Sequence, residues 1–184
     1  MKKRIVIAAC LLATVAAYAQ GAINFSNHVP YMGVDAPIFA IDGMTKLAGT
    51  GYLAELYAGR TTDTLVPIGD PLPFRTGDLA GYLVAGPPAS PTDPLRIVPG
   101  ITGGVVATVQ VRAWDVSTGA TWDAATIRGQ SVHLTLTLGF GGLPPVPPAD
   151  LLGLRSFSLQ VVPEPSTMAL GLLGACLLLL WRRK

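Results

Sequence analysis

The sequence is poor in charged residues, and the two signs nearly balance. Only 13% of its 184 residues are charged, and 13 basic against 11 acidic residues give a formal net charge of +2. This balance excludes a protein that grips nucleic acid through a strongly basic surface. A hydrophobic content of 50% and a mean hydropathy of +0.48 also exclude a disordered, highly charged chain.

Cysteine and histidine are scarcer still. The two cysteines, Cys10 and Cys176, both lie in apolar terminal segments, so the body between them has no thiol. This excludes a disulfide framework, a cysteine nucleophile and thiolate metal ligands from the body. His28 and His133 have no further His, Cys or carboxylate at ligand spacing. The sequence therefore predicts neither a transition-metal site nor a bound cofactor.

The first 19 residues have the layout of an export signal. A cationic start, Met1–Arg4, precedes an apolar run, Ile5–Ala17, that is too short to span a bilayer comfortably. Ala17 and Ala19 place small residues at −3 and −1 before Gln20. We therefore predict a helical signal peptide over 1–19, exported by the Sec machinery and cut by signal peptidase after Ala19. The alternatives are lipidation at Cys10, through a lipobox-like Ile7–Cys10, and a buried N-terminal helix.

The last 23 residues combine three features in a fixed order. Pro163, Glu164 and Pro165 come first, followed by an apolar run over 168–181 and a basic end. The prolines favour an extended, accessible segment. The apolar run predicts a transmembrane helix, and the cations Arg182, Arg183 and Lys184 predict a cytoplasmic stop-transfer end. The body would then face away from the cytoplasm.

This order of features, together with a signal peptide, resembles the PEP-CTERM family of exported bacterial proteins. The resemblance covers Val162–Lys184. It implies that residues 162–184 are a sorting tail, read by a membrane-embedded exosortase and removed near Pro163-Glu164-Pro165. The precursor would span the inner membrane once, and the body would then reach the cell surface or an extracellular polysaccharide matrix. The alternative is an ordinary C-terminal membrane anchor.

Residues 20–161 are predicted to form one strand-rich domain. Apolar and polar residues alternate through Val105–Ala113, Ser131–Leu138 and Ser156–Val161, which is typical of strands with one solvated face. The expected fold class is all-β: an antiparallel β-sandwich of jelly-roll or immunoglobulin-like type. Six weaker strand candidates bring the total to nine, and they are Ala22–Ser26, Ile38–Ile41, Tyr52–Tyr57, Thr64–Ile68, Gly81–Val84 and Leu95–Val98. Ala120–Arg128 is predicted to hold a short helical turn.

The body offers little that points to catalysis, and we predict that it is not an enzyme. The sequence contains no Gly-x-Ser-x-Gly elbow, the motif that would suggest a hydrolase triad. Glu55 is the only glutamate of the body, so paired glutamates for glycoside cleavage are lacking. The aspartates mostly adjoin Gly, Pro or Thr, as turn residues do. A calcium site in these loops is the alternative.

Aromatic residues provide the one hint of a ligand. Trp114 follows a predicted strand, where an indole could stack on a sugar face; the other candidates are Trp122, Tyr31, Tyr52, Tyr57 and Tyr82. A core position is the ordinary alternative for each of them. Two functions are therefore kept: a non-enzymatic surface or matrix protein, and a secreted module that binds, or less plausibly cleaves, carbohydrate.

Overall fold

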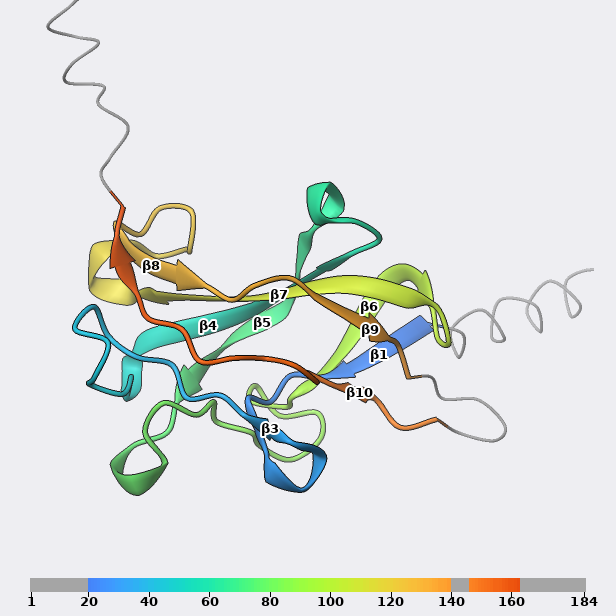
Figure 1. The fold of residues 1–184 in the computed structure, drawn as a ribbon, viewed down its shortest axis with the longest axis horizontal. Coiled ribbons are helices and arrows are strands. Elements are labelled where there is room, and N and C mark those ends of the chain that lie inside the picture. Colours follow the sequence, from blue (N-terminus) through green and yellow to red (C-terminus); the bar gives the residue numbers. More distant parts are fainter. Residues whose placement is uncertain (1–19, 140–145, 163–184) are drawn as a thin grey trace, which may run out of the picture.

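The computed structural model describes residues 20–139 and 146–162, in which strands are the main regular secondary structure (Figure 1). Four short 3₁₀ helices lie between strands: η1 (Pro30–Met32), η2 (Thr62–Thr64), η3 (Gly77–Leu79) and η4 (Val116–Thr118). The strands are β1 (Gln20–Asn24), β2 (His28–Val29), β3 (Val34–Asp35), β4 (Gly49–Gly59), β5 (Val66–Phe74), β6 (Leu95–Thr102), β7 (Val106–Asp115), β8 (Ile127–Gln130), β9 (Leu134–Thr137), β10 (Ala149–Asp150) and β11 (Gln160–Val161).

Two sheets and one small ribbon organise these strands. The larger, six-stranded sheet has the order β11-β8-β7-β4-β5, with β9 also paired to β7. The smaller sheet has the order β10-β1-β6, and β2 pairs with β3. Among the named strands, all pairs are antiparallel except β1 with β10, which is parallel. The predicted all-β class and the antiparallel sheets are confirmed, and the jelly-roll or immunoglobulin-like sandwich type stays a prediction.

One hydrophobic core draws on both sheets. Ile23 and Val98 come from the smaller sheet, whereas Leu56 and Val109 come from the larger one. The predicted alternation is confirmed in β7, where Ala107, Val109, Val111 and Ala113 are all completely buried. Burying apolar area of this extent is the main favourable term available to a body without disulfides.

Edge position explains a strand longer than predicted. The sequence suggested a strand over Thr64–Ile68, but β5 continues to Phe74 through Pro67, Pro71 and Pro73. Proline has no N–H to donate and is tolerated only where a strand lacks a neighbour. β5 ends the six-stranded sheet, so the outward side of its backbone needs few donors.

Three of the predicted elements are not regular in the structure. Ile38–Ile41 and Gly81–Val84 contain only isolated bridges, at Phe39 and at Leu83. In the first segment, successive N–H groups bond to Gly81, Phe157 and Thr45, so no single neighbouring strand exists. In the segment predicted as a helical turn, residues 120–126 contain a turn but no helix, and β8 begins at Ile127.

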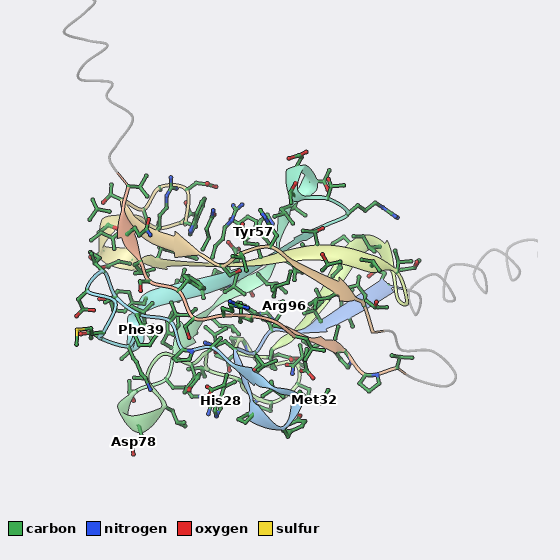
Figure 2. All side chains as sticks on the ribbon, viewed as in Figure 1. His28, Met32, Phe39, Tyr57, Asp78 and Arg96 are labelled. Atoms are coloured by element: carbon green, nitrogen blue, oxygen red, sulfur yellow. The ribbon has the colours of Figure 1, made fainter. Side chains whose placement is uncertain are left out.

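Two buried polar side chains connect segments that are distant in sequence. Asn27 is fully buried; its Nδ2 donates to the carbonyl oxygens of Ala36 (2.8 Å) and Gly81 (2.9 Å), and its Oδ1 accepts from the N–H of Leu83 (2.8 Å). Arg96 of β6 lies in the middle of the body (Figure 2) and donates through Nη2 to the carbonyl oxygen of Asp70 in β5 (2.7 Å). Burial lowers the pKa of the Arg96 guanidinium from its ordinary value.

The predicted terminal helices fall outside the described residues. The signal peptide over 1–19 and the tail from Pro163 onward are not among them. In the part of the chain that the structure does describe, no helix is long and apolar enough to cross a membrane.

Candidate functional site

The last strand of the body ends at Val161, and the predicted sorting motif begins two residues later in the sequence, at Pro163. Gln160 and Val161 of β11 pair with Arg128 and Ile127 of β8. The N–H of Val162 then donates to the carbonyl oxygen of Thr126 at 2.7 Å. The next residue in the sequence, Pro163, has no N–H and cannot extend this ladder. The body therefore holds its chain up to Val162, with no linker before Pro163-Glu164-Pro165.

The other predicted signal residues have the following places. Gln20, expected to become the new N-terminus, is the exposed first residue of β1. Ala17, Ala19, Pro163, Glu164, Pro165 and the basic residues Arg182, Arg183 and Lys184 lie outside the described residues.

A hollow of about 330 Å³ lies beside the point where the chain leaves the sheet. Its lining comes from β8, from β11 with the residues just before it, and from the turn before β8, and includes Trp122, Arg128, Phe157 and Gln160. In Figure 1, β11 lies alongside β8 at this end of the molecule. The surface next to the tail thus combines two aromatic rings with two amides and one guanidinium, a mixture that suits a protein-contact surface.

Alternating aromatic rings and arginines build the outer face of the sheet behind this hollow. The Arg112 Cζ lies 3.9 Å from the ring centroid of Tyr57 and 4.3 Å from that of Trp122. The Arg128 Cζ also lies 4.3 Å from the Trp122 ring. We call Tyr57, Arg112, Trp122 and Arg128 the cation–π stack. Each such contact is worth about 0.5–1 kcal/mol at an exposed site.

Hydrogen bonds fix the cation–π stack. Trp122 Nε1 donates to the carbonyl oxygen of Gly129 (3.0 Å), and Arg128 Nη1 donates to the carbonyl oxygens of Trp122 (2.7 Å) and Asp123 (2.8 Å). The stack therefore fastens the 120–126 turn onto β7 and β8. The sequence did not reveal it, because only the strand register, which pairs Trp114 with Arg128 and Arg112 with Gln130, brings the two arginines to one turn.

Glu55 is the one carboxylate on this face of the central strands. It lies opposite Arg112 in the register of β4 and β7. Partial burial raises the pKa of Glu55 above its ordinary value, while a hydrogen bond to Tyr57 and the charge of Arg112 act in the opposite direction. Burial, followed by the charge of Glu55, also raises the pKa of Tyr57. These shifts belong to a packed network in which the charges of Arg112 and Arg96 lower the pKa of Glu55 and the charge of Asp123 raises it.

The structure corrects the prediction that Trp114 contacts a glycan. It lies near the end of β7 as expected, but it is only 1% exposed, so it has no free face on which a sugar could stack. Among the other candidates, Tyr82 is buried, Tyr57 is covered by Arg112, and Trp122 carries the two arginines. Tyr31 is the candidate that is strongly exposed, at 86%.

The two histidines lie in separate surroundings. His28 is in β2, where its ring lies 4.1 Å from that of Tyr82 and its Nδ1 lies 3.6 Å from Asp35 Oδ1. Tyr82 donates its hydroxyl to the same Asp35 oxygen at 2.6 Å, and this bond raises the pKa of Tyr82. His133 is exposed just before β9. Over residues 20–139 and 146–162, no three His, Cys, Asp or Glu side chains form a group that could hold a metal ion.

Comparison with known proteins identifies the tail. Residues 161–184 match the family model described as the PEP-CTERM protein-sorting motif. The resemblance seen in the sequence is confirmed, and the motif implies an exported protein with an exosortase as its processing partner. No curated protein and no solved structure matches the chain.

Proposed function

We propose that this chain, which carries a PEP-CTERM sorting tail, is the precursor of a non-enzymatic protein of the bacterial surface or extracellular matrix. The single observation that carries the proposal is the match over 161–184, which begins at the last residue of β11. The folded body would be the cargo, held in the inner membrane by its tail until the exosortase cuts near Pro163-Glu164-Pro165.

The arrangement at the end of β11 supports this division into body and tail. The last backbone bond that the body makes to this segment is from Val162 to Thr126, one residue before the motif. Cutting after Val162 would leave the sheet and the hydrophobic core whole. No linker separates the motif from the body. The enzyme would therefore have to reach a cleavage site only one or two residues beyond the segment that lies against β8. The hollow lined by Trp122, Arg128 and Gln160 would then be its first contact with the body.

Mass spectrometry of the mature C-terminus tests the proposal. In a host that has the exosortase, we expect the exported protein to lack Lys184 and to end near Pro163-Glu164-Pro165. In the same host without the enzyme, Lys184 should be retained and the protein should stay in the inner membrane. Intact Lys184 in both hosts would favour an ordinary membrane anchor instead.

Glu164→Gln is the matching variant within the chain. Removing the only charge of the motif should leave the precursor in the membrane fraction, because the enzyme would lose the carboxylate that distinguishes this segment. Asp63→Asn makes the same acid-to-amide change at an exposed position in η2 and should be released like the unmodified protein. Equal release of both variants would contradict a role for Glu164.

A second candidate function, carbohydrate binding, is favoured by one observation: an open cavity beside the exposed Tyr31, away from the tail.

A further inference from the structure

The larger described cavity, about 470 Å³, opens at the smaller sheet rather than at the tail. Its lining comes from η1, the end of β1, the start of β6 with the loop before it, and the segment 147–150 that leads into β10. Figure 2 labels Met32, the neighbour of Tyr31 in η1, at the side of the molecule away from β8 and β11. Cavities of this size bind small ligands or single units of larger ones. This pocket is therefore distinct from the hollow beside the sorting motif.

Tyr31 stands at this cavity with its ring in solvent. It is 86% exposed, the middle residue of η1, and η1 is fixed by Pro30 at its start and by the left-handed Gly33 (φ 79°) at its end. Leaving an aromatic ring in water forgoes about 1.5–3 kcal/mol of burial free energy. A ring that lies at a cavity and contributes nothing to the core is suited to stacking on an apolar ligand face.

Two carboxylates in the cavity are oriented by the protein. Asp93 accepts from the N–H of Ala89 (2.6 Å) and from that of Leu95 (2.8 Å), and these bonds lower its pKa. Asp150 Oδ1 accepts from Asn24 Nδ2 at 2.7 Å. A carboxylate has about four acceptor positions, so both groups keep lone pairs for hydroxyl donors. These bonds pre-orient the acceptors, which reduces the entropy cost of binding.

The remaining lining selects against anions. The cavity wall contains Pro88, Pro94, Pro147 and Pro148, which are apolar, stiff and without N–H donors. No Lys or Arg contributes to its described lining, so Asp93 and Asp150 give it negative charge. A phosphate or a uronic acid would be repelled there. A neutral sugar would instead offer hydroxyl donors to the carboxylates and C–H faces to Tyr31 and the prolines.

We propose that this cavity binds a neutral sugar unit of a polysaccharide. Tyr31 stacks on one face of the ring, and Asp93, Asp150 and Asn24 accept or donate hydrogen bonds at its hydroxyl edge. The site is independent of the sorting tail, so its failure and the failure of exosortase processing would be seen in separate experiments.

Calorimetric titration of the full chain tests the site, in micelles of a zwitterionic detergent without sugar groups. The probes are neutral tetrasaccharides of glucose, galactose, mannose and N-acetylglucosamine, with tetragalacturonate as the anionic comparison. We expect at least one neutral probe to bind with a Kd of about 1 mM or tighter. Tyr31→Ala and Asp150→Asn should each weaken it about tenfold or more.

Two controls make the result decisive. Met44 is 83% exposed and is not part of the cavity lining, so Met44→Ala removes a comparable exposed side chain and should leave the affinity unchanged. Trp122→Ala tests the other hollow and should also bind normally. The proposal is overturned if no neutral probe binds, if tetragalacturonate binds as tightly, or if Tyr31→Ala keeps full affinity. Loss of binding in Trp122→Ala alone would place the sugar at the other hollow and would overturn it as well.

Discussion

Asn27 shows how much one side chain contributes to this body. Its amide bonds to three backbone groups from two segments: Ala36, and Gly81 and Leu83 of the irregular segment Gly81–Val84. A buried backbone group without a partner costs about 1–3 kcal/mol. Asn27 thus ties Ala36 to Gly81–Val84, a segment whose strand pairing is limited to an isolated bridge at Leu83.

Asn27→Ala should lower the free energy of unfolding by about 3 kcal/mol, because it leaves the Ala36 carbonyl and the Leu83 N–H without this partner. Urea unfolding followed by tryptophan fluorescence measures this. Ser26→Ala is the control, since the Ser26 hydroxyl makes only two long contacts of 3.3 Å, as donor to the carbonyl oxygen of His28 and as acceptor from the His28 N–H. If both variants unfolded at the same urea concentration, the Asn27 bonds would not contribute the expected free energy of unfolding.

At the scale of elements, β11 is the strand that precedes the sorting motif, and it is only weakly paired to the sheet. It has two residues, pairs only with β8, and both of its residues are exposed. Close approach to Gly129 of β8 lets this segment lie on the sheet, because a Cβ built at Gly129 would be 2.6 Å from the Ser158 carbonyl oxygen. The segment before the tail is therefore positioned by this close backbone approach and by the Leu159 side chain, which is 1% exposed and belongs to the core.

Gly129→Val should displace the segment 158–162 while leaving the core folded. We expect faster amide hydrogen exchange at Val161 and Val162, and easier proteolysis between Arg155 and Val162. Gly51→Val introduces the same side chain into β4, where nothing lies within 4 Å of the added Cβ, and should exchange like the unmodified protein. Unchanged protection of Val162 in Gly129→Val would argue against the close contact.

At the scale of the whole molecule, stability rests on packing and hydrogen bonds alone. The core combines both sheets, and no cysteine lies between Cys10 and Cys176. This arrangement is uncommon for an exported domain of modest size, for which disulfides are a frequent support. A body of this length buries enough apolar surface to fold without them.

The exported, signal-cleaved protein should therefore have the same thermal midpoint with and without a thiol reductant. Differential scanning calorimetry in both buffers measures it, with a disulfide-containing exported protein as positive control. A midpoint lowered by reductant would show that a cross-link involving Cys176 of an unprocessed tail contributes to stability.

Local order in the sequence was sufficient to predict the tail, the strand-rich class and the main strands β4, β7 and β9. Apolar runs, proline positions and period-two alternation act through neighbours in the chain, so a single sequence reveals them. The PEP-CTERM tail in particular is a linear signal, and its residues need no fold to be recognised.

Only the tertiary structure decided where each aromatic side chain lies. The sequence favoured Trp114 over Tyr31 as a sugar platform, yet Trp114 is buried and Tyr31 stands in solvent at a cavity. The same holds for the cation–π stack and for the parallel pair of β1 with β10, whose partners are separated by many residues. Burial and register depend on which distant segments meet, and that is set by the packing of the whole chain rather than by any local pattern.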